Sequence, residues 1–230
     1  MHHEYSLEKT PDIVRVNGQQ RLASLVPGQR LSEFLREGLG QRNVKIGCDA
    51  GDCGACTVLV DGAPVCACLT PAHQAFGRTV ETVQGLCAHD PVAAKLSQSF
   101  LDHGASQCGI CTPGMMVSAV ALLRDVPAPS EGQVMDALSG ILCRCTGYRK
   151  IVEAVMAAPE GADSPTGKVG ESIRHLDGVE KVSAKIKYGD DVAPIGCLEV
   201  LVIRSPSSHA LRLKSVTSMA LRKHAVLMRS

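Results

Sequence analysis

The stretch Gly47-Cys48-Asp49-Ala50-Gly51-Asp52-Cys53-Gly54-Ala55-Cys56-Thr57 decides the fold of the first part of the chain, because it brings three cysteines together. A fourth cysteine, Cys68, follows twelve positions after Cys56. Glycines alternate with the cysteines, and a residue without a Cβ lets the backbone wrap closely around a bound group and point N–H groups at it. We therefore expect a loop that offers four thiolates to a metal centre.

The spacing Cys-x4-Cys-x2-Cys with a distant fourth cysteine is that of plant-type [2Fe-2S] sites. A disulfide framework suits short secreted chains, and zinc sites usually begin with paired Cys-x2-Cys knuckles. The spacing therefore favours a [2Fe-2S] cluster on Cys48, Cys53, Cys56 and Cys68. Cys66 is an alternative fourth ligand, because alternation along a strand would put it on the same face as Cys68.

A second set reads Cys108-x2-Cys111-x31-Cys143-x-Cys145, and its spacing alone suits zinc and iron–sulfur equally well. Its flanks, S-Q-C-G-I-C-T-P-G-M-M and L-S-G-I-L-C-R-C-T-G-Y-R-K, resemble the second [2Fe-2S] domain of the molybdenum hydroxylase family, which includes xanthine dehydrogenase, aldehyde oxidoreductase and carbon monoxide dehydrogenase. The first set is similar to that family's plant-type domain, and the resemblance covers residues 11–158. The family's A-C-L context favours Cys68 over Cys66.

This resemblance implies an electron-transfer subunit of an oxidoreductase, with no substrate-binding catalytic site of its own. Single electrons would pass from a molybdenum–pterin centre in a large partner subunit through the two clusters to FAD, a cytochrome or another acceptor. The pterin is expected as the cytosine dinucleotide, and FAD or haem would belong to partner subunits. In the family, residues at the positions of Gln107 and Cys145 lie beside the pterin. The alternatives are a free-standing ferredoxin-like carrier and a zinc-stapled scaffold.

Residue patterns predict an α+β chain whose first domain, residues 1–89, is a β-grasp plant-type ferredoxin domain. Two hairpins are expected, one with Asn17-Gly18 and one with Asp61-Gly62 at the turn, because these dipeptides favour two-residue turns. The strands are 13–16, 20–25, 57–60 and 63–66, and the apolar spacing over 31–39 predicts a short helix.

Residues 90–158 are expected to form a four-helix [2Fe-2S]-binding bundle, because the apolar period changes from two to 3.6. Helices are predicted around Val92–Phe100, around Met115–Leu123, from the capping pattern Ser130-x-x-Gln133 onward, and around Tyr148–Val155. Met115 and Met116 are expected in the core, and Val134, Leu138 and Leu142 are expected to point inward.

Residues 159–170 are a predicted linker, and the tail, 171–230, resembles the start of the family's molybdenum-binding large subunit. A split fusion with that subunit is favoured over a truncated product or a basic surface arm, because residues 198–203 alternate like a strand that would leave unpaired edges on its own. The positions that carry this likeness are Arg174, Leu176, Asp177, Gly178, Lys181, Tyr188, Asp191, Arg204, Ser205, Pro206, His209 and Ala210.

Composition fits a cytoplasmic protein. The formal net charge is +1, which gives no reason to expect a nucleic-acid partner, and no membrane span or secretion signal is expected. Many thiols suit a reducing compartment, where cysteines bind metals. Cys87 and Cys197 are expected as buried apolar residues, and Asp49 and Asp52 are expected to lower the potential of the first cluster if they lie close to it.

Overall fold

The computed structural model describes residues 13–22, 25–160, 168–171, 173–192 and 195–198. The chain divides into one unit from Met1 to Ile186 and another from Lys187 to Ser230. The described part of the second unit contains one short 3₁₀ turn, η3 (Gly189–Asp191). Most of the expected strand over 198–203 and every family-like position from Arg204 onward lie outside the described residues.

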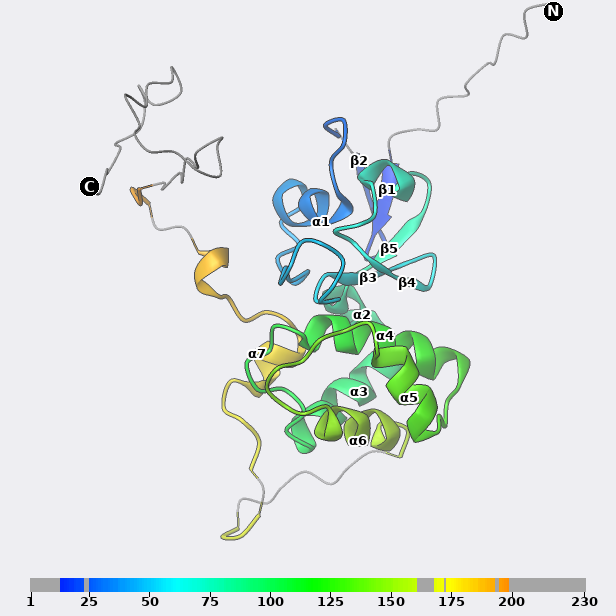
Figure 1. The fold of residues 1–230 in the computed structure, drawn as a ribbon, viewed down its shortest axis with the longest axis vertical. Coiled ribbons are helices and arrows are strands. Elements are labelled where there is room, and N and C mark those ends of the chain that lie inside the picture. The colour runs from blue at the N-terminus through cyan, green and yellow to red at the C-terminus, as the bar shows by residue number, and fades with distance from the viewer. Residues whose placement is uncertain (1–12, 23–24, 161–167, 172, 193–194, 199–230) are drawn as a thin grey trace, which may run out of the picture. The chain divides into compact units, whose positions relative to one another are not determined.

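The first unit begins with a five-stranded mixed sheet in the order β2-β1-β5-β3-β4. Its central strands β1 and β5 are parallel, whereas β1 with β2 and β3 with β4 are antiparallel hairpins. This is the predicted β-grasp arrangement (Figure 1). The strands are β1 (Ile13–Val16), β2 (Gln19–Leu22), β3 (Thr57–Val60), β4 (Ala63–Cys66) and β5 (Thr79–Glu81).

Both predicted hairpin turns are confirmed, and their backbones explain the dipeptides. Asn17 and Gly18 have φ of 50° and 79°, and Asp61 and Gly62 have φ of 50° and 84°. Two successive positive φ angles define the turn that matches the twist of the flanking strands.

The predicted helix beside the sheet is also present. It starts as α1 (Leu31–Glu33) and continues as a π-turn (Phe34–Gly38). Leu31, Phe34 and Leu35 are buried and pack with β1 and β3 residues in one apolar core. A further 3₁₀ turn, η2 (Ala72–Ala75), lies between β4 and β5.

Helices make up the rest of the first unit, and all four predicted helices form. They are α3 (Pro91–Asp102), α4 (Thr112–Asp125), α5 (Glu131–Leu138) and α6 (Arg149–Ala157). Ser130 and Gln133 form the predicted capping box of α5. Two further helices, α2 (Val83–His89) and α7 (Gly178–Val182), were not predicted.

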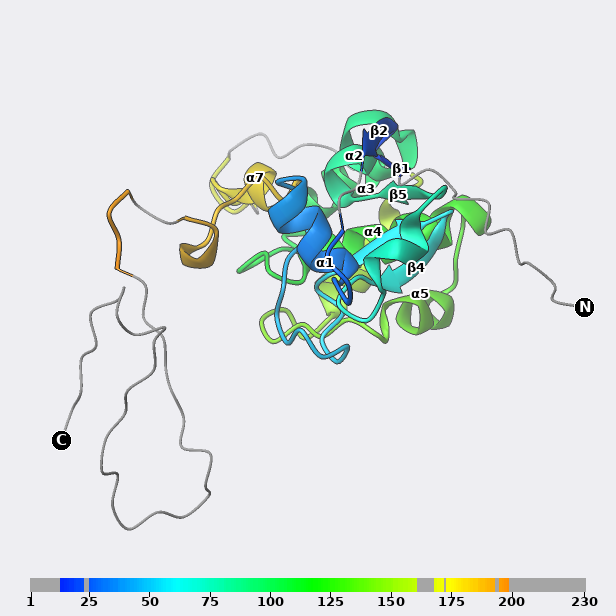
Figure 2. The same cartoon turned by 90° about the horizontal axis from the view of Figure 1, so that it is seen from above.

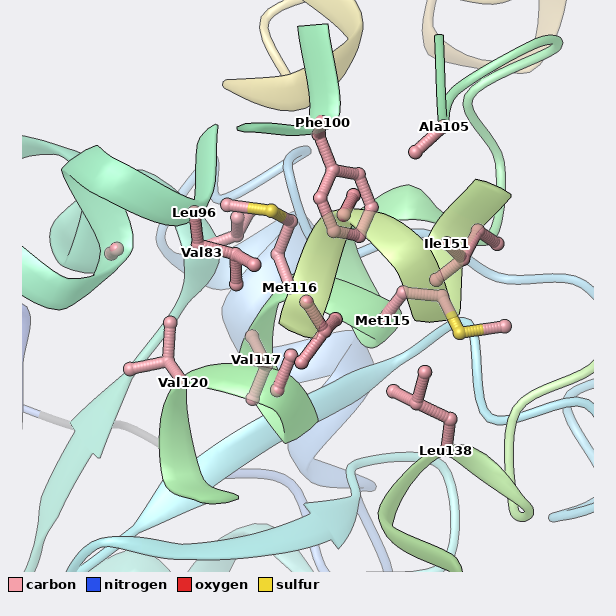
Figure 3. Close-up of a cluster of buried hydrophobic side chains, with 14 of the residues drawn as sticks. Val83, Leu96, Phe100, Ala105, Met115, Met116, Val117, Val120, Leu138 and Ile151 are labelled. Carbon is pink, nitrogen blue, oxygen red and sulfur yellow. The ribbon is translucent and has the colours of Figure 1, made fainter. Parts of the chain in front are cut away.

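The helical core is built around α4, which contacts β3 and β4 as well as α3 and α5 (Figures 1 and 2). Met115, Met116 and Leu138 are buried in it, as predicted (Figure 3). Val134 is also buried in this core, as predicted. The prediction that Leu142 points inward is wrong: this residue is 58% exposed, because α5 already ends at Leu138.

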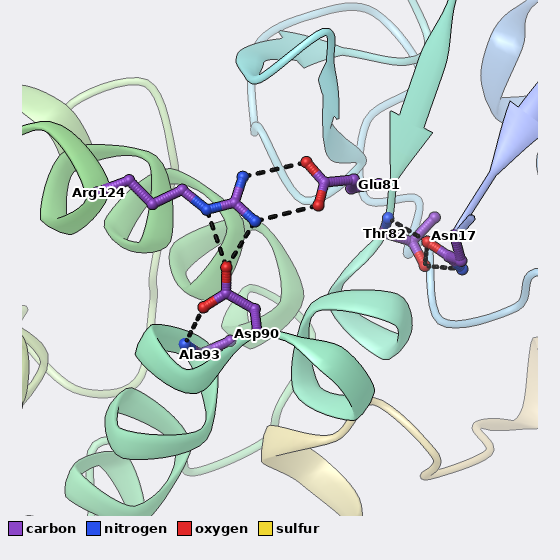
Figure 4. Close-up of polar contacts among 6 residues, drawn as sticks. All are labelled: Asn17, Glu81, Thr82, Asp90, Ala93 and Arg124. Carbon is purple, nitrogen blue, oxygen red and sulfur yellow. Dashed lines mark hydrogen bonds and ion pairs between the residues drawn. The ribbon is translucent and has the colours of Figure 1, made fainter.

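Arg124, near the end of α4, joins the helices to the sheet (Figure 4). Its guanidinium donates to Glu81 at 3.0 and 3.1 Å and to Asp90 at 2.6 and 2.9 Å. Asp90 also caps α3 by accepting from the Ala93 N–H. One side chain thus ties β5, α3 and α4 together.

Residues 173–186 belong to this first unit, although they follow the predicted linker. Helix α7 contacts α3 and α4, and Val182 and Ala184 are buried in the helical core. Arg174 forms an ion pair with Asp102 at 2.5 Å, and Cys87 Sγ donates to the Val182 carbonyl at 3.9 Å.

None of the helices in the described part of the chain is long and apolar enough to cross a membrane.

Candidate metal centres

The loop that carries the first cysteine set turns its backbone N–H groups toward sulfur. The N–H groups of Ala50 and Cys53 each lie 3.3 Å from Cys48 Sγ. The loop reaches this shape through positive φ angles at Asp49 and Gly51, 54° and 86°. These hydrogen bonds lower the pKa of Cys48 to about 7, so this thiol readily gives the thiolate that binds metal.

The four thiols of the first set come together as two pairs. Cys48 and Cys53 lie within hydrogen-bonding reach of each other, and so do Cys56 and Cys68. Burial raises the pKa of Cys56 to about 12. Such a thiol would release its proton to solvent on coordinating a metal ion, because the positive charge of the metal stabilises the thiolate.

The second set is built on the start of α4 and on the loop before α6. Cys111 is the N-cap residue of α4, where the helix end favours negative charge. The Ser106 and Thr112 hydroxyls, 2.9 Å apart, fix the ends of the loop between them, which carries Cys108.

The loop that carries Cys143 and Cys145 is held by the residues that follow these cysteines. The Tyr148 hydroxyl accepts from the Cys143 N–H at 2.8 Å and donates to the Ile141 carbonyl at 3.2 Å. The Thr146 hydroxyl lies 3.1 Å from Cys143 Sγ. Burial opposes ionisation of Cys143, but hydrogen bonds from Thr146 and from the Cys145 backbone bring its pKa below the usual value.

These thiols also form two pairs, Cys111 with Cys143 and Cys108 with Cys145. Burial raises the pKa of Cys111, and the neighbouring Cys108 thiol raises that of Cys145.

The donor sets fit two-iron clusters. All eleven cysteines are free thiols. Each set presents its four thiols as two pairs. This matches the needs of a [2Fe-2S] cluster, in which each of two irons would take two cysteine thiolates.

The backbones that carry the two sets touch each other. The N–H of Leu142, the residue before Cys143, donates to the Cys53 carbonyl at 2.9 Å. A Cβ on Gly54 would stand 2.3 Å from the Gly140 carbonyl oxygen, and one on Gly114 would stand 2.5 Å from the Gly54 carbonyl oxygen. Glycine is therefore required on both sides of this contact, which we call the junction (Cys53, Gly54, Gly114, Gly140 and Leu142).

The other cysteines and Gln107 have distinct positions. Gln107, Cys108 and Cys145 are exposed, and the thiol contact of Cys108 with Cys145 puts Gln107 beside this surface. Cys87 is partly buried against the helical core, which raises its pKa to about 11. The prediction of a buried Cys197 is wrong, because this side chain is exposed.

Comparisons with known proteins agree with this geometry. A family model described as "2Fe-2S iron-sulfur cluster binding domain" matches residues 14–88, and one described as "[2Fe-2S] binding domain" matches residues 82–156. The nicotine 6-hydroxylase small subunit of Paenarthrobacter nicotinovorans is 47% identical over 64% of this chain and 87% of its own length. The nicotinate dehydrogenase small FeS subunit of Eubacterium barkeri is 47% identical over 64% of this chain and 93% of its own.

A solved structure, the aldehyde oxidoreductase from Desulfovibrio gigas, superposes with a TM-score of 0.71 and 34% identity over 78% of this chain and 21% of that one. This match covers 78% of the chain, whereas the match to each of the two small subunits covers 64%. From these matches, the chain belongs to the family of two-domain [2Fe-2S] subunits of molybdenum hydroxylases, and it serves an oxidoreductase by electron transfer.

Proposed function

We propose that this chain relays electrons between a molybdenum–pterin centre in a large partner subunit and a further acceptor. A [2Fe-2S] cluster, when bound, takes up and releases one electron at a time. The observation that carries the proposal is the 2.9 Å hydrogen bond from the Leu142 N–H to the Cys53 carbonyl. It connects the two cysteine sets directly, since Leu142 adjoins Cys143 and Cys53 is itself a proposed ligand.

The proposed ligands are Cys48, Cys53, Cys56 and Cys68 for the first cluster, and Cys108, Cys111, Cys143 and Cys145 for the second. The thiol pairs support one iron on Cys48 and Cys53, and its neighbour on Cys56 and Cys68. In the second set they support one iron on Cys111 and Cys143, and its neighbour on Cys108 and Cys145.

Cys68 is favoured over Cys66 as the fourth ligand of the first set. The Cys68 thiol is buried and lies within hydrogen-bonding reach of Cys56. The Cys66 thiol instead has the Thr57 side chain as a hydrogen-bond partner, and burial raises its pKa.

The exposed surface at Gln107 and Cys145 supports electron input from the partner at the second set. A pterin there, proposed as the cytosine dinucleotide form, would meet a polar amide and the sulfur of a cluster ligand on the same surface. The relatives called small subunits of a hydroxylase and a dehydrogenase support such a large partner.

Electron output is proposed at the first set, toward an FAD-binding subunit or a cytochrome. Cys48 and Cys53 are only partly buried, and the neighbouring Ala50 and Asp52 are exposed, so an acceptor can approach this loop. A reducing, cytoplasmic compartment suits eleven free thiols.

We propose residues 1–89 and 90–158 as the two cluster domains, 159–170 as the linker, and 171–230 as the fragment similar to the large subunit. The greater coverage by the aldehyde oxidoreductase chain than by the separate small subunits supports a fusion to such a subunit.

The ligand assignment is tested by electron paramagnetic resonance (EPR) of the reduced protein. Two different [2Fe-2S] signals are expected. Cys68→Ser should remove one signal, Cys143→Ser should remove the other, and Cys66→Ser should keep both.

Loss of a signal in Cys66→Ser but not in Cys68→Ser would contradict the choice of fourth ligand. A colourless protein that contains zinc would contradict the proposed function as a whole.

A further inference from the structure

We propose that Arg30 is a positioning residue for the first cluster: it clamps the Cys48 loop and raises the reduction potential of the cluster there. The inference deepens the proposed function and rests on the assignment of that cluster to Cys48, Cys53, Cys56 and Cys68. The spacing of the cysteines gave no sign of it, since Arg30 lies eighteen positions before Cys48.

The Arg30 side chain reaches the loop at the residue after the first ligand. Its guanidinium donates to the Asp49 backbone carbonyl at 2.9 Å and forms an ion pair with the Asp49 carboxylate. Asp49 has a φ of 54°, in the left-handed region that is costly for a residue with a Cβ. Two contacts from one guanidinium stabilise this turn, and the turn aims the Ala50 N–H at Cys48 Sγ.

The Arg30 backbone is fixed against the other arm of the first set. Arg30 pairs with Pro71 in an isolated β-bridge, and the Leu31 N–H donates to the Thr70 carbonyl at 2.8 Å. Thr70 follows Cys68 by two positions, so the same residue contacts both arms of the cysteine set. The Glu33 carboxylate accepts from the Arg30 N–H at 3.3 Å, which also holds the Arg30 backbone in place.

The charge of Arg30 acts on the cluster potential because reduction adds an electron to the site. A nearby cation stabilises the reduced form, and a nearby anion disfavours it. Both partners are about two-fifths exposed, 42% and 43%, so solvent screens the effect and salt weakens it further.

The structure therefore separates two carboxylates that the sequence presents as equivalent. The Asp49 charge is offset by Arg30. Asp52 is exposed and forms no ion pair with any residue in the described part of the chain. The loop thus carries one neutralised and one uncompensated carboxylate.

The test is a redox titration of the holoprotein, followed by the two EPR signals. Arg30→Gln should lower the potential of the first cluster and leave that of the second unchanged. Arg30→Lys should stay closer to the wild type, because it keeps the charge. Adding Asp49→Asn to Arg30→Gln should bring the potential back toward the wild type.

Arg78→Gln is the matched control. Arg78 Nε lies 3.8 Å from Asp61 Oδ2, in an exposed ion pair of the same domain. That pair is at the turn of the β3–β4 hairpin, about 10 Å along the strands from the end that carries Cys66, given the rise per residue of a strand. No change in the reduction potential of either cluster is expected in this variant.

Two results would overturn the inference, provided that both EPR signals remain. One is an unchanged reduction potential of the first cluster in Arg30→Gln. The other is a fall of this potential in Arg30→Lys that equals the fall in Arg30→Gln. A wild-type protein without two [2Fe-2S] signals would overturn the proposed function, and this inference with it. The two failures are thus distinguished by the wild-type spectrum.

Discussion

Single charged side chains stabilise the contact between the sheet and the helices. Arg124 is the main example, because its guanidinium is shared by Glu81 and Asp90, whose side chains are 28% and 13% exposed. A charge buried to this extent depends on its partner, since removing one member leaves the other poorly solvated. The pair also lowers the pKa of Asp90: burial opposes this shift, but the Ala93 N–H and Arg124 outweigh it.

We predict that Arg124→Leu lowers the free energy of unfolding by about 1–3 kcal/mol, because two carboxylates lose their partner. The control is Arg149→Leu, which removes an exposed pair with Glu153 and should cost about 0.3–0.5 kcal/mol. Urea unfolding of the holoproteins at neutral pH measures both. Equal stability losses would show that the Arg124 contacts contribute no more than a surface pair.

The direction in which the stability of the fold changes with pH follows from the lowered pKa of Asp90. Its folded pKa lies below its unfolded value, so its carboxylate stabilises the fold above about pH 4, the usual pKa of Asp. This contribution is lost as the pH falls through the folded pKa. The stability difference between the wild type and Arg124→Leu should therefore narrow in that acidic range.

At the level of single residues, the sequence identified the cysteines but not their supports. Cysteine spacing is a local pattern, and the structure brings the eight thiols together in the predicted two sets. Arg30 reaches Asp49 across 19 positions, and the contacts of Tyr148 depend on how the loop before α6 folds, so neither shows as a spacing pattern. Tyr148 was expected only as an apolar position of a helix, yet its hydroxyl bridges Cys143 and Ile141.

Among the elements, α7 shows that the helical core extends past the predicted linker. Val182 and Ala184 are 1% and 4% exposed in that core, and Asp102, the ion-pair partner of Arg174, has a side chain only 6% exposed. Lys45, in the β-grasp part, donates to the Ile186 carbonyl at 3.1 Å. The segment 173–186 thus contacts both parts of the first unit.

We predict that a chain ending at Ile186 keeps the stability of the first unit, whereas one ending at Glu160 loses about 2–4 kcal/mol, because Val182 and Ala184 no longer cover the core. The shorter chain should also expose Cys87, whose pKa burial raises to about 11. Urea unfolding and alkylation of Cys87, located by mass spectrometry, measure the two effects. Equal stability and equal labelling of both chains would contradict this role of α7.

Sequence periodicity predicted the longer helices and the hairpins, but not the short elements. Strong signals marked α5, through its capping box, and the two hairpins, through their turn dipeptides. β5 has three residues and α7 has five, which is too short for a period to show. Leu142 continues the helical spacing of α5 but lies past the end of this helix, and its backbone N–H donates to the Cys53 carbonyl at the junction.

At the scale of the whole molecule, we propose that the two clusters work as one relay through the junction. Both arms of the second set meet the loop of the first. Helix α4, which starts after Cys111, approaches this loop through Gly114, and the turn between α5 and Cys143 approaches it through Gly140 and Leu142. A free-standing carrier needs no such contact between two complete cysteine sets.

Gly54→Ala tests the junction. Gly54 has a φ of 65°, and an added Cβ would meet the Gly140 carbonyl oxygen at 2.3 Å, so the two loops must separate. The matched control is Gly62→Ala, with a φ of 84° and no atom within 4 Å of an added Cβ. Both variants carry the backbone strain, of about 1 kcal/mol, but only Gly54→Ala adds the clash.

The most direct measurement is the EPR spectrum of the fully reduced protein, in which both clusters are paramagnetic. We predict that the two signals broaden or split through mutual magnetic coupling in the wild type and in Gly62→Ala, and that the coupling weakens in Gly54→Ala. Two signals that are the same whether one cluster or both are reduced would contradict the relay.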